Sequence, residues 1–189
     1  MTVPEPLVFP TAFEGLSRAF RFDDEAAGKL LALGVNLERL DPAYPLATFL
    51  SALDVAADTL GTLGTSVTRY RLLGRAYVKG WVGTKSGLAT VTVGRLLGPK
   101  RLLRRMQATF RTSANYVVTE VKDQPVRALE LVVKSGDEFV PRLPANCGRL
   151  IDYRHGLLEG TVEQFGLKDS VDIVERDDAR AMAHYLIKW

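Results

Sequence analysis

The chain has 189 residues, of which 47% are hydrophobic and 25% are charged, with a mean hydropathy of +0.01; this composition excludes a disordered chain and predicts a single domain over residues 1–189. Its one cysteine, Cys147, excludes a disulfide scaffold and a structural zinc site built mainly from cysteines. The formal net charge of +3 conceals a segregation, because residues 59–119 carry eleven basic residues and no acidic one, whereas acidic residues outnumber basic ones in residues 1–58 and 120–189.

The first third of the chain has the patterns of a short strand followed by three helices. Thr11 and Glu14 are spaced as a capping box, which predicts that a helix begins there. Pro45 suits the first turn of a helix whose apolar residues recur every three or four positions. The predicted elements are a strand at Leu7–Phe9 and helices over residues 11–20, from Asp23 to Gly34, and from Pro45 to about Leu60.

The segment Ser66–Gly98 has a helical period but contains five glycines before its last residue, namely Gly74, Gly80, Gly83, Gly87 and Gly94. Each glycine inside a helix costs about 1 kcal/mol relative to alanine, so this number requires a reason. Two reasons stay open: close approach of a neighbouring helix or of a ligand, and a break in the helix near Gly80–Gly87. Pro99 then begins a helix that extends to about Thr112.

The second half of the chain changes to the pattern of strands. Two segments rich in β-branched residues flank a turn signal at Asp123–Pro125. The predicted elements are strands at Tyr116–Lys122 and Arg127–Lys134, a helix over Asn146–Phe165 that ends at Gly166, and strands at Ser170–Arg176 and Ala181–Trp189. This order predicts an α+β fold, in which N-terminal helices pack on a small antiparallel sheet of about four strands and one helix is inserted between the strand pairs.

The stretch NCGRLIDYRHGLLEGTVEQFG, Asn146–Gly166, and the two strands after it resemble the C-terminal half of vinyl-reductase-like domains. In that half a cysteine precedes a helix with a Gly-x-x-x-Gly pair, and Cys147, Gly156 and Gly160 match these positions. The same fold is shared with subunits of the transport-particle (TRAPP) tethering complex and with haem–nitric-oxide-binding sensors. The resemblance implies a pocket between helices and sheet for a small molecule or acyl chain, or assembly into larger complexes. The last hairpin lacks the further cysteines of many vinyl-reductase-like domains, so no metal site is expected.

Over nearly its full length, the chain also resembles an uncharacterised family expanded in myxobacteria. The matching stretches, in chain order, are FEGLSRAF, DPAYPLATFLSAL, LLGRAYVKGW and LLGPKRLLRRMQATFRTSANYVVTEV. Each stretch is moderately specific by itself, and their order along the chain supports the resemblance.

Haem-binding members of this superfamily have an axial histidine and a Tyr-x-Ser-x-Arg motif that holds the porphyrin propionates. This chain contains only His155 and His184 and lacks that motif, so neither haem nor another cofactor is expected. Gly80–Ser86 is similar to a phosphate-binding loop, but Thr84 separates the glycine from the lysine and the preceding segment has a helical pattern. This spacing favours helix packing over nucleotide binding.

No pattern in the chain indicates an enzyme. Cys147 and His155 are eight residues apart, about 12 Å along a helix, which is too far for a hydrogen-bonded dyad. Glu159 and Glu163 are spaced four residues apart, as on a solvated helix face. We therefore expect no catalytic residues.

Five aromatic residues are our candidates for lining an apolar ligand pocket, although a place in the core is the more frequent explanation for each one alone. They are Tyr77, Trp81, Phe110, Tyr116 and Tyr153. The helical segment Ser66–Gly98 is the predicted pocket wall, because glycines leave room for a ligand. Gly156 and Gly160 are expected either in close helix packing or in a dimer interface.

The helix that begins at Pro99 is predicted to have a basic face formed by Lys100, Arg101, Arg104 and Arg105. Such a face either pairs with the acidic flanks of the same molecule or binds an anionic partner, such as an acidic protein. No helix-turn-helix pattern supports nucleic-acid binding. A homodimer is the expected assembly.

The cellular compartment is predicted from targeting signals that the sequence does not show. Residues 1–10 have neither the basic nor the apolar part of a secretory signal, and no segment has the roughly 18 uninterrupted apolar residues of a transmembrane helix. With its single cysteine, the chain is expected to be cytoplasmic. The predicted function is a non-enzymatic sensory or ligand-binding module that holds a small apolar or amphipathic molecule. The alternative is an interaction scaffold whose basic helical face binds an acidic partner.

Overall fold

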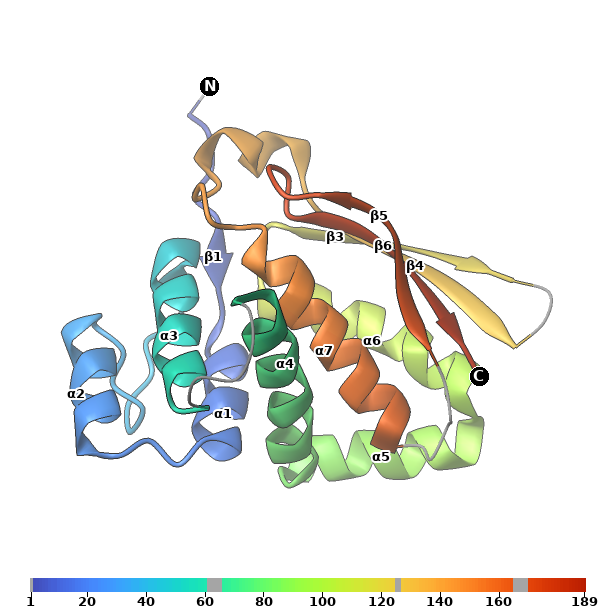
Figure 1. The fold of residues 1–189 in the computed structure, drawn as a ribbon, viewed down its shortest axis with the longest axis horizontal. Helices are drawn as coiled ribbons and strands as arrows, with labels where there is room; N and C mark the ends of the chain where they lie inside the picture. The colour runs from blue at the N-terminus through green and yellow to red at the C-terminus, as the bar shows by residue number, and fades with distance from the viewer. Residues whose placement is uncertain (1, 61–65, 125–126, 165–169) are drawn as a thin grey trace.

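The computed structural model describes residues 2–60, 66–124, 127–164 and 170–189. In these residues, seven α-helices and one 3-10 helix accompany a two-stranded and a four-stranded antiparallel sheet. Figure 1 shows the helices gathered on one side of the four-stranded sheet. The predicted α+β class is therefore confirmed, including the helix inserted between two strand pairs.

The N-terminal elements follow the predicted order. Pro10 lies at the start of the first helix, which begins one residue before Thr11, and no side chain caps it. The predicted capping box is therefore wrong, because proline, which lacks an N–H, already suits the first helical position. Asp23 does cap the second helix by accepting a hydrogen bond from the Ala26 N–H at 2.8 Å. The elements are β1 (Leu7–Val8), α1 (Pro10–Ala19), α2 (Asp24–Ala32), β2 (Tyr44–Pro45) and α3 (Leu46–Asp58).

The glycine-rich segment is divided into two helices, as one of the two predicted readings required. α4 (Ser66–Val82) ends before Gly83, and Thr84 caps α5 (Lys85–Leu97) by accepting a hydrogen bond from the Gly87 N–H at 2.9 Å. Gly98 joins α5 to α6 (Pro99–Ser113) with a φ of 83°, a conformation that glycine adopts without a steric penalty.

The four-stranded sheet has the order β3-β4-β6-β5, and each pair in it is antiparallel. Alternate residues of β4 and β6 are buried, which is the pattern of a sheet with one face against a core. The predicted turn at Pro125 and the predicted helix end at Gly166 lie outside the described residues. The elements are β3 (Val117–Asp123), β4 (Ala128–Ser135), the 3-10 helix η1 (Asp137–Arg142), α7 (Arg149–Gln164), β5 (Val171–Asp177) and β6 (Met182–Lys188).

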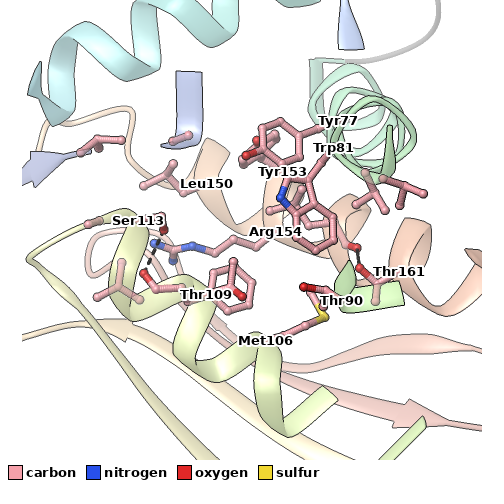
Figure 2. A pocket seen from close by; sticks show the side chains of 18 of the residues that line it. Tyr77, Trp81, Thr90, Met106, Thr109, Ser113, Leu150, Tyr153, Arg154 and Thr161 are labelled. Carbon is pink, nitrogen blue, oxygen red and sulfur yellow. Dashed lines mark hydrogen bonds between the residues drawn. The ribbon is translucent and has the colours of Figure 1, made fainter. Parts of the chain in front are cut away.

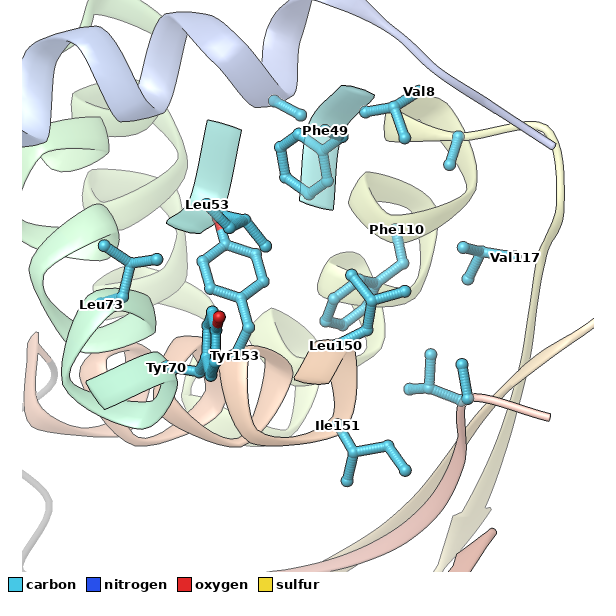
Figure 3. Close-up of a cluster of buried hydrophobic side chains, with 14 of the residues drawn as sticks. Val8, Phe49, Leu53, Tyr70, Leu73, Phe110, Val117, Leu150, Ile151 and Tyr153 are labelled. Atoms are coloured by element: carbon cyan, nitrogen blue, oxygen red, sulfur yellow. The ribbon is translucent and has the colours of Figure 1, made fainter. Parts of the chain in front are cut away.

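The core lies between the helices and the covered face of the sheet. Figure 3 shows its centre, where Phe49 and Leu53 of α3 meet Leu150 and Tyr153 of α7. Leu53 is fully buried, and the other three side chains are at most 5% exposed. Burial of this apolar surface is the main contribution to the stability of the fold.

α4 and α7 pack so closely that glycine is required at the contact. We call Gly74, Gly156 and Gly160 the glycine seam. A Cβ atom added to Gly74 would lie 2.1 Å from the Tyr153 carbonyl oxygen, and one added to Gly156 would lie 1.9 Å from the Arg71 carbonyl oxygen. The α7 glycines thus serve helix packing within one molecule, which was one of the two predicted alternatives.

Ion pairs connect the basic helix α4 to acidic parts of the chain. Arg71 binds Glu159 of α7 with an Nε–Oε2 distance of 2.7 Å, and Arg75 binds Glu163 one turn further along. Glu163 is exposed, as the predicted solvated face requires, whereas Glu159 is half-buried, and each of the two carboxylates is paired with an arginine of α4. Part of the charge segregation is thus neutralised within the molecule, although such partly exposed pairs contribute little to stability.

Across the described residues, we find no helix with the length and apolar character needed to cross a membrane.

Candidate ligand pocket

A cavity of about 120 Å³ lies among α4, α5, α6 and α7, and most of its lining is apolar. The polar residues of the lining are threonines, one serine, one glutamine and one arginine, in addition to three tyrosines. The residues that line it are Val8, Ala12, Phe49, Tyr77, Val78, Trp81, Val82, Thr90, Val91, Leu102, Met106, Thr109, Phe110, Ser113, Ala114, Tyr116, Val117, Leu150, Tyr153, Arg154, Leu157, Thr161 and Gln164.

The structure brings together all five aromatic residues that the sequence suggested. Tyr77 and Trp81 come from successive turns of α4, Phe110 from α6, Tyr116 from the start of the sheet, and Tyr153 from α7. Figure 2 shows Tyr77, Trp81 and Tyr153 at one wall of the pocket and Met106 at another. Their role in binding stays a prediction, but their common location is a property of the fold.

The aromatic wall is held in place by ring contacts. Tyr153 packs edge-on against Tyr77, with ring centroids 5.9 Å apart, and against Phe49, with centroids 6.1 Å apart. The Tyr77 hydroxyl donates a hydrogen bond to the Thr11 carbonyl oxygen at 3.2 Å. Burial raises the pKa of the phenols of Tyr77 and Tyr153 above the ordinary value, so both are neutral at physiological pH.

The glycines of Ser66–Gly98 do not widen the pocket, which corrects the reason given for that prediction. Gly74 faces α7, and a Cβ on Gly80 would lie 2.4 Å from the Cα of Ala19 in α1. α4 does form a wall of the pocket, but through Tyr77, Val78, Trp81 and Val82. The contact of Gly80 with α1 also agrees with the predicted packing role of Gly80–Ser86.

Among the described residues, sequence reasoning missed the one charged residue of the pocket lining, Arg154 of α7. Its side chain lines the cavity, is only 4% exposed, and donates a hydrogen bond from Nη1 to the Ala181 carbonyl oxygen at 2.8 Å. A signal was present in the sequence, because Arg154 lies four residues after Leu150 and four before Leu158, on the apolar side of a helix.

The two histidines lie away from the pocket lining. His155 Nε2 lies 2.7 Å from the Val171 carbonyl oxygen, and burial lowers the pKa of this imidazole. His184 Nε2 lies 3.2 Å from a carboxylate oxygen of Glu130. Neither histidine lines the cavity, so the residues present do not provide the axial histidine of a haem site. Among the described residues there is also no group of three or more His, Cys, Asp or Glu side chains placed to hold a metal ion.

Cys147 precedes α7, and Cys147 and His155 bind different backbone carbonyl oxygens. The Cys147 Sγ–H donates to the Asp178 carbonyl oxygen at 3.2 Å, and burial raises the pKa of the thiol. A buried thiol with a raised pKa is a poor nucleophile.

The four basic residues of α6, Lys100, Arg101, Arg104 and Arg105, are exposed, whereas Leu102 and Leu103 of the same helix are buried.

Residues 6–189 match the family model described as "Protein of unknown function (DUF2378)". The chain belongs to the DUF2378 family. No curated protein matches this DUF2378 chain at a significant level.

Among solved structures, this DUF2378 chain is similar to H-NOX domains. An oxygen-binding H-NOX domain related to soluble guanylate cyclases, in its oxygen complex, is 18% identical, with 94% of this chain and 90% of that chain covered and a TM-score of 0.64. An Fe(II) unliganded H-NOX mutant from K. algicida is 13% identical, with 95% of each chain covered and a TM-score of 0.55. A structure from work on haem redox potential and porphyrin distortion is 17% identical, with 95% and 96% covered and a TM-score of 0.61.

These similarities show the fold of this DUF2378 protein. They support the sequence resemblance to haem–nitric-oxide-binding sensors at the level of architecture. The resemblances to vinyl-reductase-like domains and to TRAPP subunits stay predictions.

Proposed function

We propose that this DUF2378 protein is a non-enzymatic sensory module that holds a small apolar or amphipathic molecule in the pocket. The observation that carries the proposal is the cavity itself, which is mostly apolar and is lined by six aromatic residues, the five predicted ones and Phe49. H-NOX structural neighbours, one of which binds oxygen, support a sensory role. The lining extends from Val8 to Gln164, which supports residues 1–189 acting as one domain.

The size of the cavity indicates the size of the ligand. An engineered apolar cavity of about 150 Å³ takes up benzene or xenon. A volume of about 120 Å³ therefore suits a molecule with a body near the size of one aromatic ring. A porphyrin is much larger, and the histidines lie outside the cavity, so the proposed ligand is not haem.

Filling the cavity with protein atoms should remove ligand binding. Val91 of α5 is 6% exposed and lines the pocket, so Val91→Phe places a ring in the space that a ligand needs. We expect the wild-type protein to gain thermal stability with benzene or indole, and the variant to gain none, because a ligand stabilises only a state that binds it. Differential scanning fluorimetry with and without each probe measures this difference.

The matched control is Val174→Phe, because Val174 is 60% exposed on β5 and does not line the pocket. This variant should keep the response of the wild-type protein. Native mass spectrometry of the protein purified from its own cells is a second readout. A wild-type protein that carries no ligand and responds to neither probe contradicts the proposal.

A second candidate function rests on the exposed basic side chains of α6. These four like charges lie on the surface of one helix, which suits contact with an acidic protein. If this surface binds a partner, changing Arg101, Arg104 and Arg105 to Glu should remove that partner from a pull-down and leave the circular dichroism spectrum unchanged. Retention of the partner by the triple variant contradicts the scaffold function.

A further inference from the structure

Two charged side chains are buried two residues apart on α7, and only one of them has a charged partner. Asp152 and Arg154 are each 4% exposed. The Asp152 carboxylate accepts two hydrogen bonds from Arg176, at 2.7 Å from Nη1 and 3.1 Å from Nη2. Arg154 donates to the neutral Ala181 carbonyl oxygen, and no carboxylate in the described parts of the chain lies within 4.0 Å of it.

The groups that surround Arg154 do not balance its charge. The guanidinium of Arg154 also hydrogen-bonds to the phenol of Tyr116, and its charge acts on the phenol of Tyr185 and the thiol of Cys147. Burial raises the pKa of each of these three groups, so all are neutral at physiological pH. An arginine does not lose its proton in a protein, so its charge persists in the core. A buried charge is unfavourable unless an opposite charge joins it.

The position of Arg154 makes the pocket amphipathic. In Figure 2 its side chain extends along the cavity, with the guanidinium at the end where Ser113 and Thr109 lie. Trp81 and Met106 lie further along the same cavity, where the lining is mainly apolar. A ligand placed here meets a cation at one end and aromatic and thioether surface along its body.

We propose that the pocket binds a small monocarboxylate, whose carboxylate pairs with the Arg154 guanidinium while its apolar body lies against Trp81 and Met106. This inference rests on the proposed function of the pocket as a ligand site. The planar fork of a guanidinium matches a carboxylate with two parallel hydrogen bonds. The lining contains one cationic side chain, which suits a singly charged carboxylate better than a phosphate dianion.

The charge of the ligand is tested by pairs of probes that differ only in the head group. We compare benzoate with benzamide and hexanoate with hexanamide, by calorimetry and thermal unfolding on the full chain. We expect the wild-type protein to bind each acid about 10- to 100-fold more tightly than its amide, the range for a hydrogen bond to a charged group. Arg154→Met should remove this preference.

The variant also separates a binding role of Arg154 from a structural one. Methionine replaces an uncompensated charge with an apolar side chain of similar length, so the unliganded Arg154→Met protein should unfold at the same temperature or higher. Arg154→Lys, which retains the charge without the fork, should keep a weaker preference for the acids. If Arg154→Met does not fold, the loss of preference is measured on Arg154→Gln.

Four other results would each contradict a different part of the proposal. Equal binding of acids and amides by the wild-type protein contradicts the carboxylate and leaves the pocket as a site for neutral molecules. Tighter binding of phenyl phosphate than of benzoate replaces the carboxylate with a phosphate. An Arg154→Met protein that is less stable yet still prefers the acids assigns Arg154 a structural role. A wild-type protein that binds none of these probes, nor benzene or indole, contradicts the proposed function itself.

Discussion

Gly156→Ala should lower the free energy of unfolding by about 3 kcal/mol or more, at the upper end of the range for overpacked cores. The added Cβ would lie 1.9 Å from the Arg71 carbonyl oxygen, and a backbone atom cannot rotate away as a side chain can. α4 and α7 must therefore separate, which disturbs the wall that carries Tyr77 and Tyr153. Urea unfolding followed by circular dichroism measures the loss.

Gly28→Ala is the control, because Gly28 is exposed in the middle of α2 and nothing lies within 4 Å of the added Cβ. Here the same change should stabilise the protein by about 0.5–1 kcal/mol, since alanine favours the helix. A Gly156→Ala protein that is as stable as the wild type shows that α4 and α7 are further apart than described.

Asp152→Ala should lower the free energy of unfolding by about 3 kcal/mol, the lower end of the range for breaking a buried ion pair. The substitution removes the carboxylate that binds Arg176 through two hydrogen bonds, and so detaches α7 from β5. Arg176 also binds Asp178 with an Nε–Oδ1 distance of 2.7 Å and is partly exposed, which limits the loss. Chemical unfolding of the purified variant gives the value.

Asp172→Ala provides the comparison, because Asp172 forms an exposed ion pair with Lys188 at 3.0 Å. Its loss should change stability little, since exposed pairs contribute little. Replacing both Asp152 and Arg176 with apolar residues should recover part of the loss, because no buried charge is then left alone. If Asp152→Ala and Asp172→Ala have equal effects, burial does not strengthen the Asp152–Arg176 pair.

The order of elements was predictable because local signals mark most of the ends. Asp23 caps α2, Pro45 precedes α3, and Pro99 begins α6, as their side chains favour. The capping box at Thr11 failed because two local signals overlapped, and Pro10 determined where α1 begins. Local patterns predict such ends well until two of them compete within one turn.

The site was predictable in its aromatic part and not in its charged part. Tyr77 and Trp81 are four residues apart, so a helical period alone places both on one face. The helical period places Arg154 in line with Leu150 and Leu158, but an arginine on a helix is usually exposed, so the burial of its charge was not predicted. Its burial results from α7 lying between α4 and the sheet, an arrangement made by residues far away in the chain.

The role of the glycines depended in the same way on distant contacts. The five glycines between Ser66 and Gly98 required a reason, and close approach of either a ligand or a neighbouring helix would explain them. Gly74 meets Tyr153 and Gly156, about 80 residues later in the chain, so only the folded arrangement separates the two reasons. No glycine among the described residues lines the pocket, so its space depends on the directions of the larger side chains around it.

The glycine seam and the pocket lining occupy different positions of the same two helices. None of Gly74, Gly156 and Gly160 lines the cavity, whereas Tyr77, Trp81 and Arg154 do. Natural variation can therefore exchange the lining residues while the interhelical spacing is kept, and a new ligand specificity can evolve without a new scaffold. Members of the family that retain the three glycines but differ at these lining positions are where divergent specificities should be sought.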